Sequence, residues 1–150
     1  MKNLYRIIIL IVAFILISPV IGNAQCKNFA KKICKLELDP YIHDGNYNAA
    51  ILTEGEEAEL SKTFYADQEY RIAVCGSDAL PPVQFRLLDL ERNVLYDNAE
   101  ADYSQIWDFS MESSQQLIIS VKVMKNEAED EGNMELISGC VSIMFGIKED

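Results

Sequence analysis

Apolar residues recur at every second position in a series of short segments that fills most of the chain after residue 47. The clearest segments cover residues 69–74, 83–87, 107–111, 117–123 and 141–147. Weaker alternation covers residues 47–52, 59–65 and 94–98. Successive side chains of a strand point to opposite faces, so each segment predicts a strand with one buried face. About eight such strands, separated by turns and not by helices, predict an all-β fold, an antiparallel β-sandwich of jelly-roll type.

The first 24 residues have the organisation of an export signal. Two basic residues precede an apolar run at residues 7–17, a proline interrupts the run, and residues 22–24 offer the small side chains that a signal peptidase selects. We expect cleavage after Ala24. Residues 25–150 then form a single disulfide-stabilised domain, which is long enough to bury a core of its own.

Two alternatives for this segment are a retained membrane anchor and a lipid-modified cysteine. The apolar run is shorter than the ~20 residues that a membrane-spanning helix needs, which disfavours the anchor. A lipoprotein would carry its acyl chain on Cys26, but Gln25 stands where the processing enzyme takes a small residue. We therefore expect a soluble periplasmic or secreted product that does not insert into the membrane after its signal is removed.

The charge balance of the chain limits its partners. Acidic residues outnumber basic residues by 24 to 13, and removal of residues 1–24 takes the formal net charge from −11 to −13. Phosphate backbones and anionic lipid surfaces repel such a protein as a whole. The balance argues against nucleic acid as a partner and leaves an unknown extracellular or periplasmic protein or glycan.

Four cysteines, Cys26, Cys34, Cys75 and Cys140, lie in the exported part of the chain. An even number of cysteines in an exported protein indicates disulfides formed in an oxidising compartment. Zinc sites instead use close Cys-x-x-Cys pairs, often with histidine. No two cysteines here have that spacing and His43 is the only histidine, so disulfides are favoured over a metal.

Residues 25–36 have the apolar spacing of a short amphipathic helix, with Cys26 and Cys34 on its apolar face. Eight positions along a helix span about 12 Å, which is beyond disulfide reach. Alternation places Cys75 and Cys140 on the outer faces of their strands. We expect the helix to lie across an outer sheet face, with one disulfide from each helical cysteine to Cys75 or Cys140. The pairing stays open, and the alternative is a Cys75–Cys140 bridge with Cys26 and Cys34 joined through an unwound segment.

The chain offers little material for catalysis. His43 lies in a turn-forming loop, where we expect it to be exposed, and no nucleophile is marked by the pattern. Four oxidised cysteines leave no thiol. The many carboxylates cannot be paired into a glycosidase dyad from the sequence, and a solvated surface is their ordinary role. We expect a protein that is not an enzyme and that has no cofactor.

Two acidic segments are weak candidates for calcium. One contains Asp97 and Asp102 with two oxygen-bearing neighbours, and the other contains Glu129 and Asp130 between further glutamates. Neither has the spacing of an EF-hand loop, so solvated charged loops without metal are the preferred interpretation.

Tyrosines near the expected loops are candidates for a binding surface. Tyr41, Tyr47 and Tyr103 each follow or precede turn-forming residues, and such rings stack on sugars or on partner proteins. Each is also a normal residue for the rim of a core. Trp107 is in phase with Phe109, so we expect it in the core.

Residues 58–123 resemble the bacterial pre-peptidase C-terminal type of secreted β-sandwich. The resemblance is carried by residues 64–74 (FYADQEYRIAV), 85–89 (FRLLD) and 116–121 (QLIISV). The four cysteines and the N-terminal helix depart from the pattern of that family. The resemblance implies a non-catalytic secreted module that aids the binding, targeting or stability of other extracellular proteins.

Two functions remain open on these grounds. The first is a free-standing exported binding or accessory module that recognises a protein or glycan through its loops or an exposed sheet. The alternative is a small acidic exported inhibitor or immunity-type protein that acts on a basic enzyme, because strong negative charge steers a protein to a basic cleft. A hydrolase is the third and least supported function.

Overall fold

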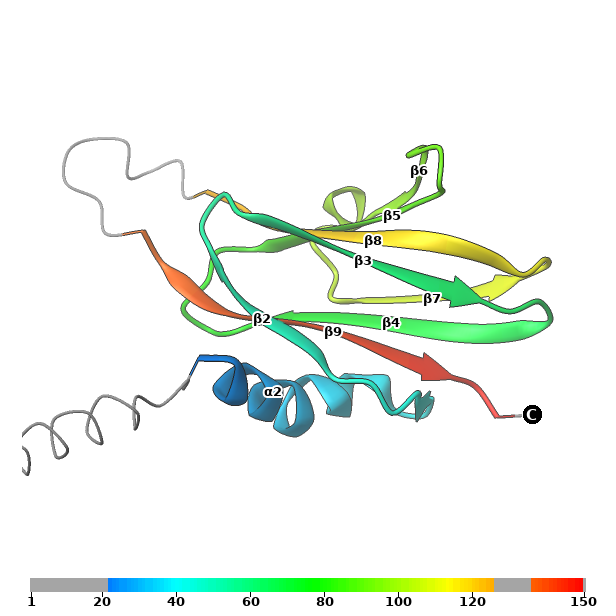
Figure 1. The fold of residues 1–150 in the computed structure, drawn as a ribbon, viewed down its shortest axis with the longest axis horizontal. Helices are drawn as coiled ribbons and strands as arrows, with labels where there is room; N and C mark the ends of the chain where they lie inside the picture. The colour runs from blue at the N-terminus through cyan, green and yellow to red at the C-terminus, as the bar shows by residue number, and fades with distance from the viewer. Residues whose placement is uncertain (1–21, 126–135, 150) are drawn as a thin grey trace, which may run out of the picture.

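The computed structural model describes residues 22–125 and 136–149 of the chain, and the predicted signal segment up to residue 21 and the acidic pair Glu129 and Asp130 lie outside these ranges. The described part contains one α-helix, two 3₁₀ helices (η) and nine strands (Figure 1). In chain order these are α2 (Gly22–Lys32), η1 (Cys34–Leu38), β1 (Ile42–His43), β2 (Asn48–Thr53), β3 (Glu57–Phe64), β4 (Gln68–Gly76), β5 (Val83–Leu88), β6 (Val94–Asp97), η2 (Asn98–Ala101), β7 (Ile106–Met111), β8 (Gln115–Val123) and β9 (Ser138–Ile147).

The strands form two antiparallel sheets that pack face to face. One sheet has the order β2-β9-β4-β7, with β1 beside the end of β9, and the other has the order β3-β8-β5-β6. The antiparallel pairs β2·β9, β3·β8, β4·β7 and β5·β6 are nested, as in one long hairpin whose strand pairs fold alternately into the two sheets. This is the arrangement of a jelly roll, and it confirms the predicted fold class.

The interior of the sandwich contains the apolar residues that alternate in the sequence. Phe64, Phe85, Ile119 and Phe145 are among the side chains that are fully buried between the sheets. The ring of Phe64 contacts aromatic rings of the opposite sheet at centroid distances of 4.9–5.9 Å. Edge-to-face contacts of this kind add to the stabilisation from buried apolar surface. The alternation of apolar residues therefore accounts both for the strands and for the packing of one sheet on the other.

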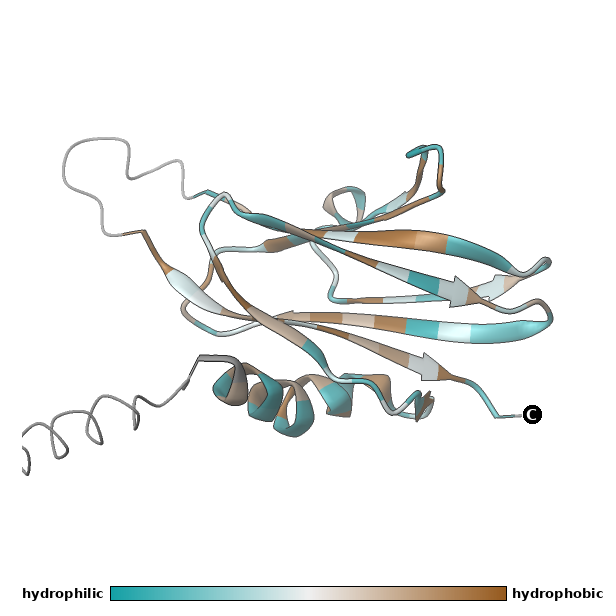
Figure 2. Cartoon of the chain, viewed as in Figure 1, coloured by the Kyte–Doolittle hydropathy of each residue, from teal (hydrophilic) through white to brown (hydrophobic). Residues whose placement is uncertain are grey.

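Helix α2 and η1 cover the outer face of the β2-β9-β4-β7 sheet (Figure 1). Small side chains make this possible: Ala30 of the helix is completely buried, as is Ala73 of β4, in a second apolar cluster beneath the helix. Figure 2 shows the helix with hydrophilic residues interleaved with apolar ones, as an amphipathic helix requires. No helix in the described ranges is long and apolar enough to cross a membrane.

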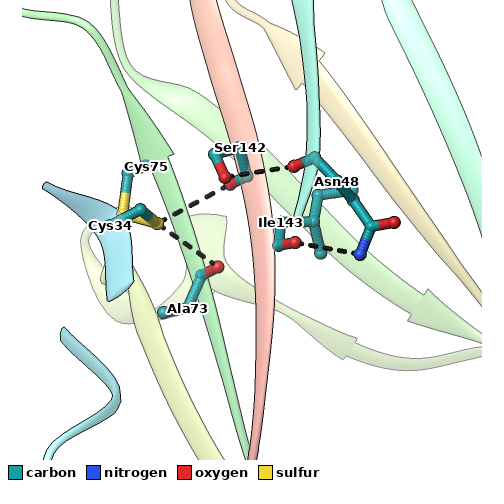
Figure 3. The surroundings of a disulfide bond; sticks show 6 residues. All are labelled: Cys34, Asn48, Ala73, Cys75, Ser142 and Ile143. Carbon is teal, nitrogen blue, oxygen red and sulfur yellow. Dashed lines mark hydrogen bonds between the residues drawn. A yellow bond between two sulfur atoms is a disulfide. The ribbon is translucent and has the colours of Figure 1, made fainter. Parts of the chain in front are cut away.

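Two disulfides fasten this helical segment to the sheet. Cys26 is bonded to Cys140 at the start of β9, and Cys34 is bonded to Cys75 near the end of β4. The second bridge lies beneath η1, where Cys34 Sγ packs 3.7 Å from the carbonyl oxygen of Ala73 (Figure 3). One bridge thus leaves each helical cysteine, as the outer-face placement of the strand cysteines predicts, and the alternative of a Cys26–Cys34 bridge is absent.

The N-terminal helix that residues 25–36 predict is confirmed, although it is not one continuous α-helix: α2 ends at Lys32 and the chain continues as the tighter η1, in which Cys34 and Leu38 are buried. One local expectation was wrong. His43 is not an exposed loop residue. It lies in β1 with only 8% of its side chain exposed, because its ring packs against Tyr47 at 4.6 Å and its Nε2 bonds the carbonyl oxygen of Asn46.

Candidate functional site

Two connections meet at the end of the sandwich where β4 finishes. Residues 77–82 join β4 to β5, and residues 98–105 join β6 to β7. Between them lies a hollow of about 370 Å³, lined by Ser77, Asp78, Leu80, Pro81, Pro82, Tyr103 and Gln105 together with the adjoining strand ends. We call this surface the loop end. It brings together one of the three candidate tyrosines, two prolines and several carboxylates.

A buried asparagine holds the β6–β7 connection in place. Asn98 is only 1% exposed. Its Oδ1 accepts a hydrogen bond from Phe85 N at 2.8 Å, and its Nδ2 donates to the carbonyl oxygens of Val83 and Ser104, both at 3.1 Å. Its own carbonyl oxygen accepts from Tyr103 N at 2.9 Å. One side chain therefore ties both ends of the connection to β5, and the loop is fixed before any partner arrives.

The tip of the same connection has an uncommon backbone. Asp102 and Tyr103 are adjacent and both lie in the left-handed region, with φ values of 52° and 54°. Such a conformation is rare for residues other than glycine and persists only where the surroundings enforce it. The bonds to Asn98 supply that enforcement, and the resulting turn places Tyr103, half-buried, beside the hollow.

The β4–β5 connection is anchored to the start of β9. Ser77 N donates to the carbonyl oxygen of Cys140 at 2.9 Å, and Cys140 N donates back to Ser77 Oγ at 3.2 Å. Gly139 permits this approach, since a Cβ there would lie 2.3 Å from Ser77 Oγ and 2.7 Å from Leu80 Cγ. The Cys26–Cys140 disulfide joins the same point to α2. The connection is thus fixed from two sides.

The charge of the loop end is wholly negative. Neither connection contains a lysine or arginine, and together they carry Asp78, Glu100 and Asp102, all exposed. Asp97 at the start of the β6–β7 connection is half-buried and is held by Gln84 Nε2 at 2.9–3.0 Å and by Ala99 N at 2.9 Å. The surface can receive cationic groups without any prior ion pair having to break.

The other two candidate tyrosines do not line the hollow of the loop end. Tyr41 packs against Gly146 and under the guanidinium of Arg71, which is 4.6 Å from its ring centroid, near the beginning of β4. Arg71 also binds Asp108 through two 2.7 Å bonds and donates to the carbonyl oxygen of Asp39. Tyr47 packs beneath the helix. Both rings contribute to packing, and the structure does not bring them together with Tyr103.

The calcium candidates are not gathered into a site within residues 22–125 and 136–149. There, no group of three or more histidine, cysteine, aspartate and glutamate side chains is placed to hold a metal. Asp97 bonds Gln84 and the backbone, while Asn98 beside it is directed inward to β5. Asp102 lies at the loop tip, and Glu129 and Asp130 lie outside the described residues.

Sequence reasoning missed Asn98, Ser77 and Gly139, which position the loop end. Asn98 is one of the two oxygen-bearing neighbours of Asp97 and Asp102 in an acidic segment, so its sequence context favours an exposed side chain. Gly139 directly precedes Cys140, and this neighbour is the signal that the sequence offers for it. Trp107 is half-buried and stacks between Tyr96 and Phe109 at centroid distances of 4.3 and 4.5 Å, against the edge of the core.

Comparison with known proteins finds likeness among solved structures. No protein-family model matches the chain, and no curated protein matches its sequence. Among solved structures, the chain is similar to PliG of Aeromonas hydrophila, a periplasmic lysozyme inhibitor of g-type lysozyme. The TM-score is 0.51 with 14% sequence identity, and the match covers 73% of this chain and 89% of PliG. At this identity the likeness establishes a shared fold.

The resemblance to pre-peptidase C-terminal sandwiches was wrong. No family model supports it, and the structural likeness is to PliG instead. The segments that carried the resemblance, residues 64–74, 85–89 and 116–121, are strands β4, β5 and β8 with their flanking turns. Alternation and turns of this kind occur in many β-sandwiches, so they specify the architecture and not the family.

Proposed function

We propose that this protein is an exported inhibitor of a basic cell-wall hydrolase of the lysozyme type, and that it binds the enzyme through the loop end. The proposal rests above all on one observation: two connections fixed by Asn98, Ser77 and a disulfide present a tyrosine and three carboxylates with no cation among them. The likeness to PliG, an inhibitor of g-type lysozyme, supports the choice of enzyme class.

The physical argument is one of preorganisation and charge. Binding through flexible loops loses affinity to the ordering of those loops, whereas the loop end is ordered already. Its carboxylates complement a basic cleft and raise the rate of encounter with it. Tyr103, which lines the hollow between the two connections, supplies a rigid aromatic contact. The two disulfides are typical of a periplasmic or extracellular protein.

The test is inhibition of purified g-type, c-type and i-type lysozymes on peptidoglycan by the oxidised protein. We expect stoichiometric inhibition of at least one class, and a loss of affinity on Tyr103→Ala of about 2 kcal/mol, or thirtyfold. Tyr65→Ala is the matched control, because Tyr65 is 63% exposed on the β3–β4 connection at the opposite end of β4. Equal losses for both variants would argue against the loop end.

A second pair of variants tests the charges. The triple substitution D78N/E100Q/D102N removes the carboxylates of the loop end, while D67N/E112Q/E149Q removes three exposed carboxylates from the hollow of about 620 Å³ at the other end. Only the first should slow association with the enzyme. Binding to glycan without inhibition of any lysozyme would instead favour an exported glycan-binding module, the other function that the sequence left open.

A further inference from the structure

The exposed side of α2 and η1 carries a concentration of positive charge that the rest of the chain lacks. Residues 25–36 contain four lysines and no acidic residue, whereas residues 37–150 contain 24 acidic and seven basic residues. All four lysines are exposed, and two large apolar side chains are exposed among them. We call this surface the lysine face. It consists of Lys27, Lys31, Lys32, Lys35, Ile33 and Leu36.

The lysines of the lysine face differ from most of the other basic residues, which form ion pairs. Five of the seven basic residues after residue 36 form ion pairs, namely Lys62, Arg71, Arg86, Arg92 and Lys148. Within the part of the chain that the structure describes, no ion pair involves Lys27, Lys31, Lys32 or Lys35. Their charge is therefore available to an outside partner.

Helix stability alone does not explain this surface. Lysines in a last turn favour a helix through its dipole, which accounts for Lys31 and Lys32. Lys27 lies earlier in α2 and gains nothing from this effect. Leu36 is 71% exposed and Ile33 is 53% exposed, in the same short segment as the lysines, and exposed apolar side chains gain nothing from water. An amphipathic surface of this composition fits the interface of an anionic bilayer.

We propose that the lysine face binds the surface of a bilayer that contains anionic phospholipid, without crossing it. Each lysine near such a surface adds to the attraction, and Leu36 and Ile33 enter the headgroup region. The net negative charge of the whole protein opposes binding only weakly, because charges beyond about 8–10 Å are screened at physiological salt. Glu37 is the nearest acidic residue in sequence and follows the face directly.

The bound orientation leaves the loop end available. All six residues of the lysine face are exposed, whereas Ala30, Cys34 and Leu38 of the same segment are buried in the cluster against the sheet. None of the six lines the hollow that contains Tyr103. Attachment would hold the protein at a membrane while the loop end stays exposed to the surrounding compartment. The inference is independent of the proposed inhibitor function.

The experiment is vesicle flotation of the exported protein, expressed from its full reading frame and purified oxidised, with its N-terminus fixed by mass spectrometry. We expect binding to vesicles of phosphatidylglycerol and phosphatidylcholine, and none to phosphatidylcholine alone. The substitution K27Q/K31Q/K35Q should weaken binding by about a hundredfold. Its control is K122Q/K125Q/K148Q, which removes the same charge from other elements and should leave binding unchanged.

The apolar contribution is separated from the ionic one by I33S/L36S, which should weaken binding while leaving its salt dependence intact. Thermal melting confirms that each variant is folded. Absence of binding to anionic vesicles, equal binding to neutral vesicles, or equal loss in both lysine triples would each overturn the proposal.

Discussion

Asn98 determines the loop end without touching a partner. Its side chain is buried and joins β5 to both ends of the β6–β7 connection, so the left-handed turn at Asp102 and Tyr103 depends on it. A polar residue in an acidic stretch resembles a surface residue in sequence. Its role comes from its position beside β5, where its side chain bonds the backbone of Val83 and Phe85.

Replacement of Asn98 by alanine should therefore affect both stability and binding. The backbone groups of Phe85, Val83 and Ser104 lose their partner, which should lower the free energy of unfolding by about 1–3 kcal/mol. Urea unfolding measures this change, with Asn28→Ala on the exposed helix surface as the control. If lysozyme inhibition by the folded N98A variant were undiminished, the loop would not act through preorganisation.

A second residue-scale prediction concerns Asp44, which joins the β1–β2 connection to β3 of the other sheet. Its Oδ2 is 2.6 Å from Lys62 Nζ, and its side chain is 6% exposed. Burial alone would raise the pKa of Asp44, but the hydrogen bond and charge of Lys62 and the bonds from Asn46 outweigh it and hold the pKa below the ordinary 3.8. The ionised form is thus favoured by folding.

Asp44 therefore stabilises the folded protein at pH values above the ordinary carboxyl pKa. This contribution is lost as the pH falls through the lowered pKa that Asp44 has in the folded state. Asp44→Asn should reduce the free energy of unfolding by about 1–3 kcal/mol at neutral pH. The difference from the native protein should shrink below pH 3.8. Urea titrations over this range give the answer, and a difference that is independent of pH would contradict it.

At the scale of elements, two disulfides join the helical segment to the sheet, and the two have different roles. Cys34–Cys75 fixes η1 over β4, and Cys26–Cys140 fixes α2 to the strand end that also anchors the β4–β5 connection. The first bridge holds η1 on the sheet. The second also supports the loop end.

Removal of either bridge should destabilise the protein by about 4 kcal/mol, because each closes a long loop of the unfolded chain, with separations of 41 and 114 residues. The consequences for binding should differ. C26A/C140A should increase amide exchange in residues 77–82 and weaken inhibition, whereas C34A/C75A should expose α2 and η1 and leave inhibition close to native. Hydrogen exchange with mass spectrometry compares the two double variants. The same pattern of amide exchange in both variants would contradict different roles for the two disulfides.

At the scale of the whole molecule, charge is segregated. Positive charge is concentrated on α2 and η1, and the rest of the chain carries a large negative excess, without any cation at the loop end. The net charge alone predicts a protein that anionic surfaces repel. The distribution of charge instead leaves the lysine face positive and the loop end negative.

Association with a basic enzyme should therefore depend strongly on salt. Raising the salt from about 50 to about 500 mM shortens the screening length severalfold, so the association rate should fall by about tenfold or more while dissociation changes little. Stopped-flow or surface-based kinetics with the inhibited lysozyme separates the two rates. An association rate indifferent to salt would show that charge does not steer the encounter.

The alternation of apolar residues was sufficient to predict the sandwich, its jelly-roll type and the outward direction of Cys75 and Cys140, because the two-residue period of a strand is a local property. The outward direction of these two cysteines predicts a helix that two disulfides hold against the sheet, and the structure confirms it. The three candidate tyrosines do not lie together: Tyr41 packs beside Arg71, Tyr47 packs against the apolar cluster beneath the helix, and Tyr103 lines the hollow of the loop end. A binding role for these tyrosines stays a prediction.

What the sequence by itself determined was the period of each segment, the excess of negative charge and the pairing of its four cysteines in disulfides. The tertiary structure decided which cysteines pair, which connections meet, and that Asn98 and Gly139 serve the loop end. The physical reason is the range of the interactions: strand alternation depends on neighbours two residues apart, whereas Cys26 meets Cys140 and Ser77 meets Gly139 only after the long hairpin has rolled.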